Sequence, residues 1–289
     1  EMPFLVKLGT LWLLVVLFAA IYAQLDAKVF NGSLPLGDPN LQLNGFNPAT
    51  GEFGDREPLE SPSWAHPLGT DALARDTFSR AIHGAYVSVT VAIVSVVCGV
   101  IVGGLIGSLA GYVRGKTETA LMALLDVVLA FPALVLVLAL VSIFEVRDLF
   151  VISLVIGLLS IPAYTRVSRA NSLAISNREF VLAAQAIGTK RWTILRREII
   201  PNVLPTLLAY AMVAAAAVVV VEGSLSFLGL SVQLPTSSWG NMINQSRRDI
   251  KVNFGQILYP SLILTMTVLA LNQVGDFFQR RSAFRGSSL

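Results

Sequence analysis

The sequence predicts an all-α protein that crosses a membrane several times. Of the 289 residues, 54% are hydrophobic and 13% are charged, whereas soluble domains carry about 25% charged residues. The mean hydropathy is +0.69, and the apolar residues gather in long runs. The net charge of +3 does not indicate a nucleic-acid partner, because Lys and Arg cluster between the apolar runs, as they do in membrane proteins.

Six apolar runs are long enough to be membrane-spanning helices, since hydrocarbon about 30 Å thick requires roughly 20 residues. The first run has a feature of a signal peptide, because small residues in "FAAIYA" offer a cleavage point. It is longer than a usual signal core, so we interpret residues 1–24 as an uncleaved first transmembrane helix. The chain starts with Glu1 and not Met, and we expect a short preceding tail. The six runs are 4–24, 82–112, 118–143, 149–172, 202–222 and 257–279.

Residues 25–80 are predicted to form an extracytoplasmic loop. The segment is rich in Gly, Pro, Asn and acidic residues, which favour turns over helices. Near its end the pattern becomes amphipathic, with Thr70 or Asp71 as the candidate N-cap. This pattern predicts a short helix that lies along the membrane surface and ends near Arg80.

The distribution of Lys and Arg predicts the orientation of the chain. More of these residues lie in one set of connections than in the other, and positively charged short loops stay in the cytoplasm. We therefore expect both termini, residues 173–201 and the tail 280–289 to be cytoplasmic. Residues 25–80 and 223–256 are then expected to face outward from a bacterial plasma membrane.

Small residues and prolines predict how the spans are shaped and packed. Glycines recur every four residues in the second run, at Gly99, Gly103, Gly107 and Gly111, which places them on one helix face where a neighbouring backbone can approach closely. Prolines within or at the start of spans free backbone carbonyls and favour kinks. These prolines are Pro132, Pro162, Pro205 and Pro260.

Residues 177–201 cannot lie in lipid. The segment holds seven charged residues, each costing about 2.5–3.5 kcal/mol at the bilayer centre, or roughly 20 kcal/mol together. Its spacing predicts one helix with an apolar face that ends at Gly188. Thr189 is then expected to cap a second helix, and Pro201 to end it. A cytoplasmic helix–turn–helix with an exposed apolar face indicates a docking surface for a partner.

This segment resembles the cytoplasmic coupling loop of ABC-transporter permeases, whose motif is E-A-A-x-x-x-G-x₉-I-x-L-P. Ala183, Ala184, Gly188 and Pro201 match the motif, and Glu198 replaces its isoleucine. Leu182 replaces the motif's glutamate, so a salt bridge made by that glutamate is not expected here. The helix–turn–helix shape does not depend on it.

Other stretches resemble the C-type subunit of dipeptide and oligopeptide (Dpp/Opp) permeases. They are "HPLGTDALARDTFSRAIHGAYVSV" at 66–89, "DVVLAFPALVLVLAL" at 126–140 and "EGSLSFLGLSVQLPTSSWGNMI" at 222–243. Asn272, Gly275 and Asp276 match the inner end of the last helix. The resemblance covers roughly residues 66–279 and leaves most of the polar loop 26–65 outside it.

The resemblance implies a type I ABC permease fold with six transmembrane helices and a five-helix core over 81–279. It implies a heterodimer with a homologous permease, two ABC ATPase subunits that bind ATP and Mg²⁺, and an extracytoplasmic substrate-binding protein. No cofactor is expected in this chain, and transport proceeds by alternating access driven by the ATPases. Peptides are the expected cargo, with nickel complexes or another small solute as the alternative.

Two sets of residues are candidates for function. Those implied to couple to the ATPases are Ala183, Ala184, Gly188, Lys190, Arg191 and Pro201; the two basic ones either meet acidic groups of the ATPase or hold the loop in the cytoplasm. Candidates for the translocation pathway or a subunit interface are Asp126, Pro132, Glu222 and Trp239.

Two other classes of protein fit the sequence less well. "AGYVRGKT" at 110–117 has three residues between its glycines where a phosphate-binding P-loop has four, and the chain lacks H-E-x-x-H and G-x-S-x-G motifs. We therefore expect no catalysis by this chain, and His66 and His83 are interpreted as loop and helix-end residues, not metal ligands. A channel or secondary transporter usually carries charges within its spans, and Asp126 is the only clear candidate.

Overall fold

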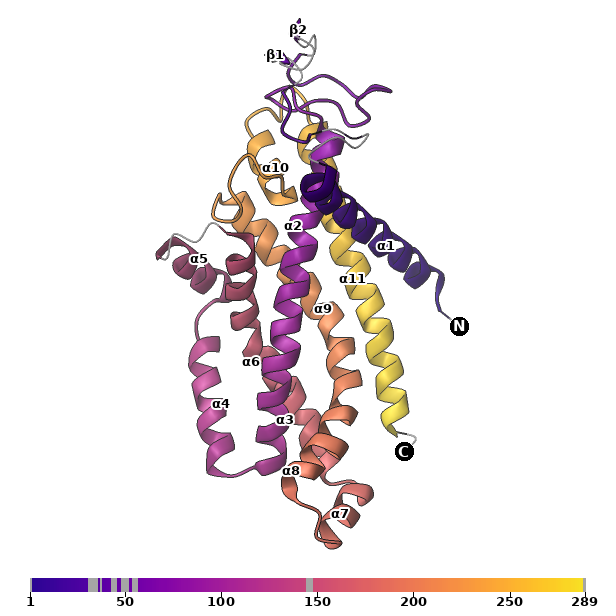
Figure 1. Cartoon of the computed structure of the whole chain (residues 1–289), viewed down its shortest axis with the longest axis vertical. Helices are drawn as coiled ribbons and strands as arrows, with labels where there is room; N and C mark the ends of the chain where they lie inside the picture. Colours follow the sequence, from indigo (N-terminus) through magenta and orange to yellow (C-terminus); the bar gives the residue numbers. More distant parts are fainter. Residues whose placement is uncertain are drawn as a thin grey trace. The chain divides into compact units, whose positions relative to one another are not determined.

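The computed structural model describes residues 2–30, 36, 38–42, 46–47, 52–53, 57–143 and 148–287. It divides into two compact units, each described by itself below (Figure 1). Four of the described helices contribute residues to both units: α2 (Thr77–Cys98), α6 (Leu149–Ser176), α9 (Ile200–Phe227) and α11 (Gly255–Ser287). Unit 1 comprises Glu1–Val91, Glu145–Leu149 and Val219–Ala270, and unit 2 comprises Ala92–Phe144, Phe150–Val218 and Leu271–Leu289.

The described residues contain five helices that are long and apolar enough to cross a membrane, or six if one bent helix pair is counted as a span. The predicted all-α, polytopic class is confirmed. The five are Phe4–Phe30, Thr77–Val113, Leu149–Ser176, Arg191–Phe227 and Gly255–Arg281.

The run 118–143 differs from the single span that the sequence predicts. It forms α4 (Lys116–Leu129) and α5 (Ala133–Ile143), which are bent by 79° at the break between them. Pro132 lies at this break, and its carbonyl accepts a hydrogen bond from the Leu136 N–H at 3.0 Å. Proline disfavours the α conformation of the residue before it and tolerates the start of a helix, so the chain bends before Pro132 and a new helix begins after it.

Unit 1 is built around α1 (Phe4–Leu25) and the first turns of α2. Gly9 of α1 lies against Ala270 of α11, and the Trp12 indole N–H donates to Thr267 Oγ1 at 3.1 Å. A short π-helical turn, η1 (Asp26–Phe30), continues α1, and two two-residue strands, β1 (Phe46–Asn47) and β2 (Glu52–Phe53), pair antiparallel. The apolar cluster of this unit joins α1, α2 and α10 (Trp239–Ser246) through Val16, Ala20, Ala81, Ala85, Trp239 and Met242.

The predicted surface helix that ends near Arg80 is wrong. Residues 70–76 form a tight turn, closed by backbone pairing of Thr70 with Asp76. Asp76, and not Thr70 or Asp71, caps α2, because its Oδ1 accepts from the Ser79 N–H at 2.7 Å. The Asp71 carboxylate is instead held by Arg75, with Nη2 and Oδ2 2.7 Å apart. Asp76 gives the first turn of α2 a side-chain acceptor for its free N–H groups, and so the helix starts at Thr77.

Unit 2 is organised by close contact between two helices. The π-helical turn η2 (Gly99–Gly103) carries α2 into α3 (Gly104–Val113), which packs on α6 (Leu149–Ser176). A Cβ added at Gly103 would lie 2.8 Å from the Ile161 carbonyl oxygen, and one at Gly111 would lie 2.5 Å from the Arg169 carbonyl oxygen. Added Cβ atoms at Gly99 and Gly107 would collide with α6 in the same way. The glycines thus bring two backbones together, as expected for small residues on a membrane helix.

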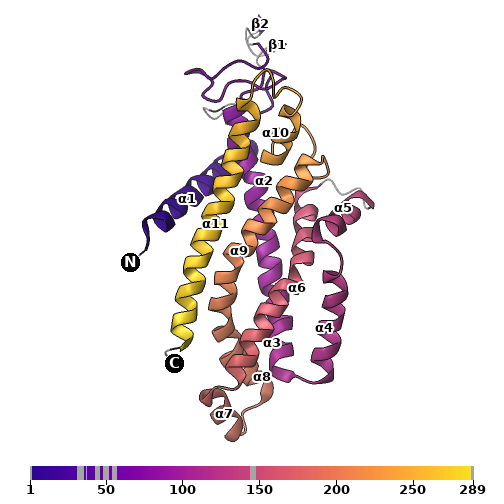
Figure 2. The ribbon, with the colours of Figure 1, turned by 180° about the vertical axis from the view of Figure 1, so that it is seen from behind.

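Serine hydroxyls bridge the same two helices. Ser168 Oγ donates to the Gly104 carbonyl at 2.7 Å, and Ser172 Oγ donates to the Ser108 carbonyl at 2.8 Å. The Ser108 and Ser168 hydroxyls lie 2.9 Å apart. All of these hydroxyls are buried, and bonds of this kind contribute about 0.6 kcal/mol each in membrane proteins. Figures 1 and 2 show α4 beside α3 and α6, and ion pairs of Arg166 with Asp126 and of Arg169 with Glu118 join α4 to α6.

We predict that Gly107→Val strongly destabilises unit 2. A side chain here meets the Thr165 carbonyl oxygen and the Ser168 Cβ, and overpacking of this kind costs about 1–3 kcal/mol. Thermal unfolding of the chain in lipid nanodiscs measures the effect. The control is Leu109→Val, which places the same side chain at a position 38% exposed on the same helix. Equal unfolding temperatures for the two variants would contradict the packing described.

Candidate functional site

The turn after α7 (Glu179–Ala186) is fixed by a glycine. Gly188 has φ +79°, a conformation that is costly for residues with a side chain. The Gly188 N–H donates to the Gln185 carbonyl at 3.0 Å, and the Thr189 N–H donates to the Ala184 carbonyl at 3.1 Å. These two bonds form a Schellman motif. The predicted end of the first helix at Gly188 is confirmed.

The second half of the loop differs from the prediction in two ways. Lys190, and not Thr189, occupies the N-cap position of α8 (Arg191–Ile194), and its side chain makes no capping bond. Pro201 does not end the helix, because α8 continues through the π-helical turn η3 (Leu195–Ile199) into α9. Proline lacks the N–H of a helix bond and clashes with the carbonyl four residues before it. A π-turn directly before Pro201 is a local adjustment of the kind that accommodates such a residue.

The loop is anchored by an apolar cluster. Val181 of α7 and Ile199 of η3 have no exposed surface. Each side chain of this kind stabilises the packed state by about 1.5–3 kcal/mol relative to exposure. The cluster therefore ties α7 to the start of α9. Its buried members are Val181, Ile194, Leu195, Ile199 and Val203, with Tyr112, Ile175, Ala184 and Ile200 packed against them.

The other side of the loop exposes large apolar side chains. Ile187 is 82% exposed and Trp192 is 65% exposed, and Phe180 and Leu182 are exposed as well. Of the apolar face predicted for the first helix, only Ala184 turns partly inward. Ala183 and Gly188 are exposed, and a Cβ added at Gly188 meets no atom within 4 Å. Large apolar side chains exposed together on a segment too charged to enter lipid indicate a candidate interaction site.

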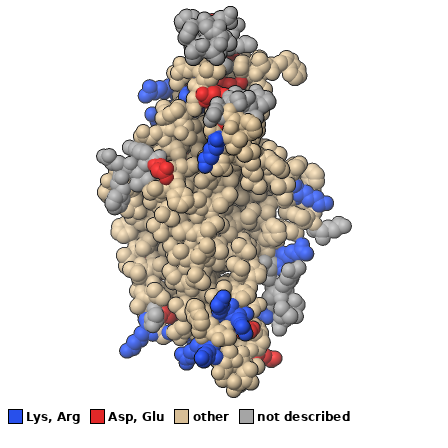
Figure 3. All heavy atoms as spheres, viewed as in Figure 1, with Lys and Arg blue, Asp and Glu red and all other residues tan. Residues whose placement is uncertain are grey.

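Basic residues accompany this apolar surface. Lys190, Arg191, Arg196 and Arg197 are all exposed. Figure 3 shows Lys and Arg side chains at the end of unit 2 that carries α7 and α8. Pro201 is also exposed, one residue after α9 begins. All six residues that are candidates for coupling to the ATPases therefore lie on one loop. One side of this loop is buried in the apolar cluster, and the other side is exposed to solvent.

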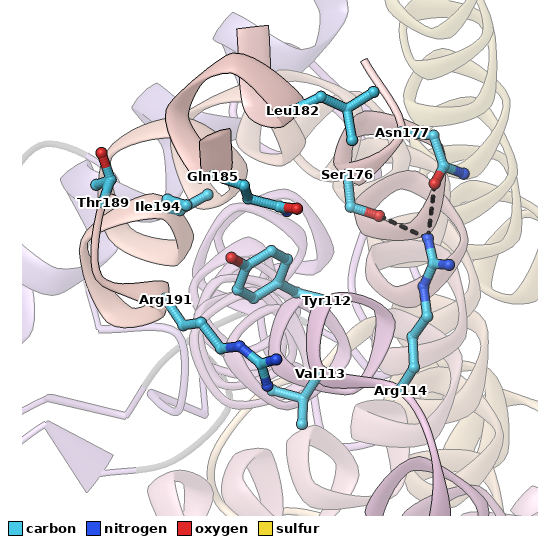
Figure 4. A pocket seen from close by; sticks show the side chains of 10 residues that line it. All are labelled: Tyr112, Val113, Arg114, Ser176, Asn177, Leu182, Gln185, Thr189, Arg191 and Ile194. Carbon is cyan, nitrogen blue, oxygen red and sulfur yellow. Dashed lines mark hydrogen bonds between the residues drawn. The ribbon is translucent and has the colours of Figure 1, made fainter. Parts of the chain in front are cut away.

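A polar pocket of about 490 Å³ separates this loop from the ends of α3 and α6 (Figure 4). The Tyr112 ring lies in the middle of the residues drawn. Arg114 Nη2 donates to Ser176 Oγ at 3.0 Å and to Asn177 Oδ1 at 2.9 Å. These bonds join the end of α3 to the end of α6, directly before the loop begins. The lining residues are Tyr112, Val113, Arg114, Ser176, Asn177, Leu182, Gln185, Thr189, Arg191 and Ile194.

Asp126 is paired with a residue that sequence reasoning missed. Arg166 Nη2 lies 2.5 Å from Asp126 Oδ1, and the side chains are 54% and 59% exposed. Each residue lies about 15 Å along its helix axis from the end of α4 or α6 next to the loop. Charges at such depth are expensive in lipid, so this face of α4 and α6 is expected to meet water or protein. Arg166 lies inside the apolar run 149–172, and an arginine at such a position is the signal in the sequence that points to it.

Glu222 and Trp239 lie inside unit 1. Glu222 has no exposed surface, and its carboxylate accepts hydrogen bonds from Ser226 Oγ at 2.6 Å and Ser88 Oγ at 3.2 Å. Trp239 is 1% exposed, and its indole N–H donates to the Ala81 carbonyl at 2.9 Å. This geometry corrects the expectation that these two residues reach a pathway or a subunit surface. They anchor the segment after α9 and the start of α10 to α2.

The described part of the chain gives no sign of a metal site. Nowhere within it do three His, Cys, Asp or Glu side chains gather in a way that would hold an ion. His66 instead pairs with Asp76 at 2.5 Å, and His83 with Asp26 at 3.1 Å. These histidines hold the residues next to α1 and the start of α2.

We predict that the Asp126–Arg166 pair behaves as a unit. Asp126→Asn or Arg166→Gln alone leaves an unpaired charge at membrane depth, so each single variant lowers the unfolding temperature in nanodiscs. The double variant removes both charges and is expected to unfold at a higher temperature than either single variant. Arg197→Gln, which removes an exposed charge outside the spans, serves as the control. Additive losses in the double variant would show that the two groups are independent.

Comparison with known proteins identifies the family. Residues 103–286, more than half of the chain, match the model for the binding-protein-dependent transport system inner membrane component. The glutathione transport system permease protein GsiD of Pectobacterium atrosepticum is 37% identical over 217 residues, which cover 75% of this chain and 72% of that protein. The GsiD proteins of Escherichia coli O6:K15:H31 and Shigella sonnei are 36% identical over 215 residues, covering 74% of this chain and 71% of theirs.

These matches include the loop 177–201 and the spans around it, where the resemblance to ABC permeases was drawn. The resemblance is confirmed. The chain belongs to the family of inner membrane components of binding-protein-dependent transport systems, the ABC permeases.

Proposed function

We propose that this chain is the permease subunit of an ATP-driven importer of a peptide-like solute, and that the loop 177–201 is the surface on which an ATPase subunit acts. The observation that carries the proposal is the apolar surface of α7 and α8, held open to solvent around the Gly188 turn. In the described chain nothing covers Gly188 within 4 Å of an added Cβ. A partner can therefore approach its backbone directly.

The small residues set how close the partner comes. Ala183 is exposed and Ala184 is partly so, and together with Gly188 they leave the outer side of the turn without bulky groups. Lys190 and Arg191 flank it and offer positive charge to acidic groups of the ATPase. Ile187 and Trp192 provide the large apolar area that a tight contact buries.

The structure of the loop supports transmission of force to the membrane. The helix from Arg191 to Phe227 is continuous, and Pro201 lies in its first α-helical turn after η3. Because Val181 and Ile194 belong to one buried cluster, displacement of α7 moves the start of α9 with it. ATP-driven closure of the motors shifts the population between inward-open and outward-open states, provided that they bind the two states with different affinity.

The partners follow from the family. The chain pairs with a homologous permease, and two ABC ATPase subunits supply the ATP and Mg²⁺ sites. An extracytoplasmic substrate-binding protein docks on the loops 25–80 and 223–256, and both termini are cytoplasmic. The family description, an inner membrane component of a binding-protein-dependent system, supports this assembly.

The cargo proposed is a peptide or a peptide-like molecule. The relatives are named as glutathione transport permeases, and glutathione is a charged tripeptide. Asp126 and Arg166 together present both signs of charge on the outside of α4 and α6, which suits a pathway for a zwitterionic solute. Pro132, at the bend after α4, sets the direction of α5. Nickel complexes or another small solute are the alternative cargo.

We predict that Gly188→Asp uncouples transport from ATP hydrolysis. The complex with its partner subunits is reconstituted in liposomes, and uptake of a labelled peptide and release of phosphate are measured together. The variant is expected to lose most uptake because an acidic side chain, in a backbone conformation that disfavours it, blocks close approach of the ATPase. Membrane insertion and the unfolding temperature of unit 2 should change little.

The matched control is Gly115→Asp. Gly115 also has φ +79° and no atom within 4 Å of an added Cβ, but it lies between α3 and α4. Its backbone, with ψ −153°, disfavours a side chain at least as strongly, and the variant adds the same charge outside the loop 177–201. Normal uptake by Gly188→Asp, or equal loss in both variants, would contradict the coupling role.

A further inference from the structure

Two cavities in unit 2 lie along the same pair of structural elements. One is the polar pocket of about 490 Å³ described above. The other is a groove of about 190 Å³ between α3 and α9, and nearly all of its lining is apolar. Both are bordered by α3 on one side and by the continuous helix from α8 to α9 on the other. The groove is lined by Val100, Ile101, Gly104, Leu105, Ser108, Ile200, Val203, Leu204 and Leu207.

The groove and the pocket follow one another along a single face of the helix. Ile101, Leu105, Ser108 and Tyr112 follow each other at intervals of four, three and four residues, which places them on a single stripe. The first three line the groove and Tyr112 lines the pocket. From Ile101 to Tyr112 the helix rises about 16 Å, which is about half of the 30 Å hydrocarbon thickness. The groove and the pocket together thus span about the length of one lipid leaflet.

The pocket at the end of this groove is positively charged. Two of its ten lining residues are arginines, Arg114 and Arg191, and none is acidic. Tyr112, Gln185 and Thr189 add hydroxyl and amide groups that donate hydrogen bonds. Arginine guanidinium groups pair well with phosphate.

The backbone of Arg114 is strained. Its backbone has φ +58° and ψ −176°, a region that costs a residue with a side chain about 1–3 kcal/mol. A single nitrogen, Nη2, makes both bonds to Ser176 and Asn177. The strained backbone and these two bonds orient the guanidinium at the pocket where α3 and α6 end.

We propose that this composite site binds an anionic phospholipid, with its phosphate in the pocket that Arg191 and Arg114 line and one acyl chain in the groove. A polar, basic pocket at the end of a membrane helix takes a lipid headgroup, and the apolar groove next to it favours a lipid over free phosphate. The lipid would fill the space between α3 and the underside of α7 and α8. It would thereby stiffen the junction between the loop and the spans. The proposal does not depend on what the transporter carries.

Lipid retention by the purified full-length chain tests the proposal. The chain is exchanged into nanodiscs or detergent containing equal phosphatidylglycerol and phosphatidylcholine, delipidated in steps, and weighed by native mass spectrometry. The wild-type chain is expected to retain one phosphatidylglycerol selectively. Arg191→Gln, which leaves the Arg114 bonds intact, should lower its affinity at least fivefold. Leu105→Trp, which fills the groove, should have a similar effect.

The control is Arg196→Gln, which removes a neighbouring exposed charge that does not line the pocket; it should bind as the wild type does. Circular dichroism and a single elution peak establish that each variant is folded. Equal retention by all variants, or equal retention of phosphatidylcholine, would overturn the proposal. So would a loss with Arg191→Gln but none with Leu105→Trp, combined with displacement by inorganic phosphate, because the ligand would then be a free anion.

Discussion

The packing of α7 against the start of α9 is the interaction on which the functional reading of this chain depends. Val181, Ile194 and Ile199 are buried together, while Ile187 and Trp192 on the opposite side are open to solvent. In the proposed function, a partner binds the exposed side of this turn, and the buried side carries the displacement to α9. An unanchored turn would bend under the same load and transmit nothing.

Close backbone contact keeps the spans next to this turn together. Burial in lipid supplies little drive for one helix to pack on another, so the contact requires small residues and internal hydrogen bonds. The glycines of η2 and α3 and the serines Ser108, Ser168 and Ser172 meet this requirement against α6. Arg114 then closes the end of the pair next to the loop. The α3–α6 contact thus holds unit 2 together and, in the proposed function, also supports the base of the loop 177–201.

Much of this arrangement is predictable from the sequence, because it depends on local rules. Gly188 ends α7 because glycine adopts φ +79° without strain. The four-residue spacing from Gly99 to Gly111 places these glycines on one face of a helix. The coupling loop was predicted as cytoplasmic because its charges cannot enter lipid. Each of these inferences needs only neighbours in the chain.

The errors involve partners that are distant in sequence or backbone adjustments that sequence rules do not foresee. Pro201 was expected to end a helix, and the η3 turn before it lets the helix continue. Pro132 was expected to kink a single span, and the chain instead breaks there into two helices bent by 79°. Arg166 was not among the candidates, because its partner Asp126 lies on another helix. Glu222 and Trp239 were expected at a surface, and tertiary packing buries them.

Cross-linking from Ile187 tests the central claim most directly. The chain has one cysteine, Cys98, so a Cys98→Ser background accepts a single Ile187→Cys substitution at the most open apolar position of the loop. In the intact complex, a short thiol-directed cross-linker should join this residue to an ATPase subunit, and a cysteine at Leu109 in the same background should give no such product. If Ile187→Cys yields no cross-link to an ATPase while the complex remains assembled and active, the loop is not the surface on which the ATPase acts.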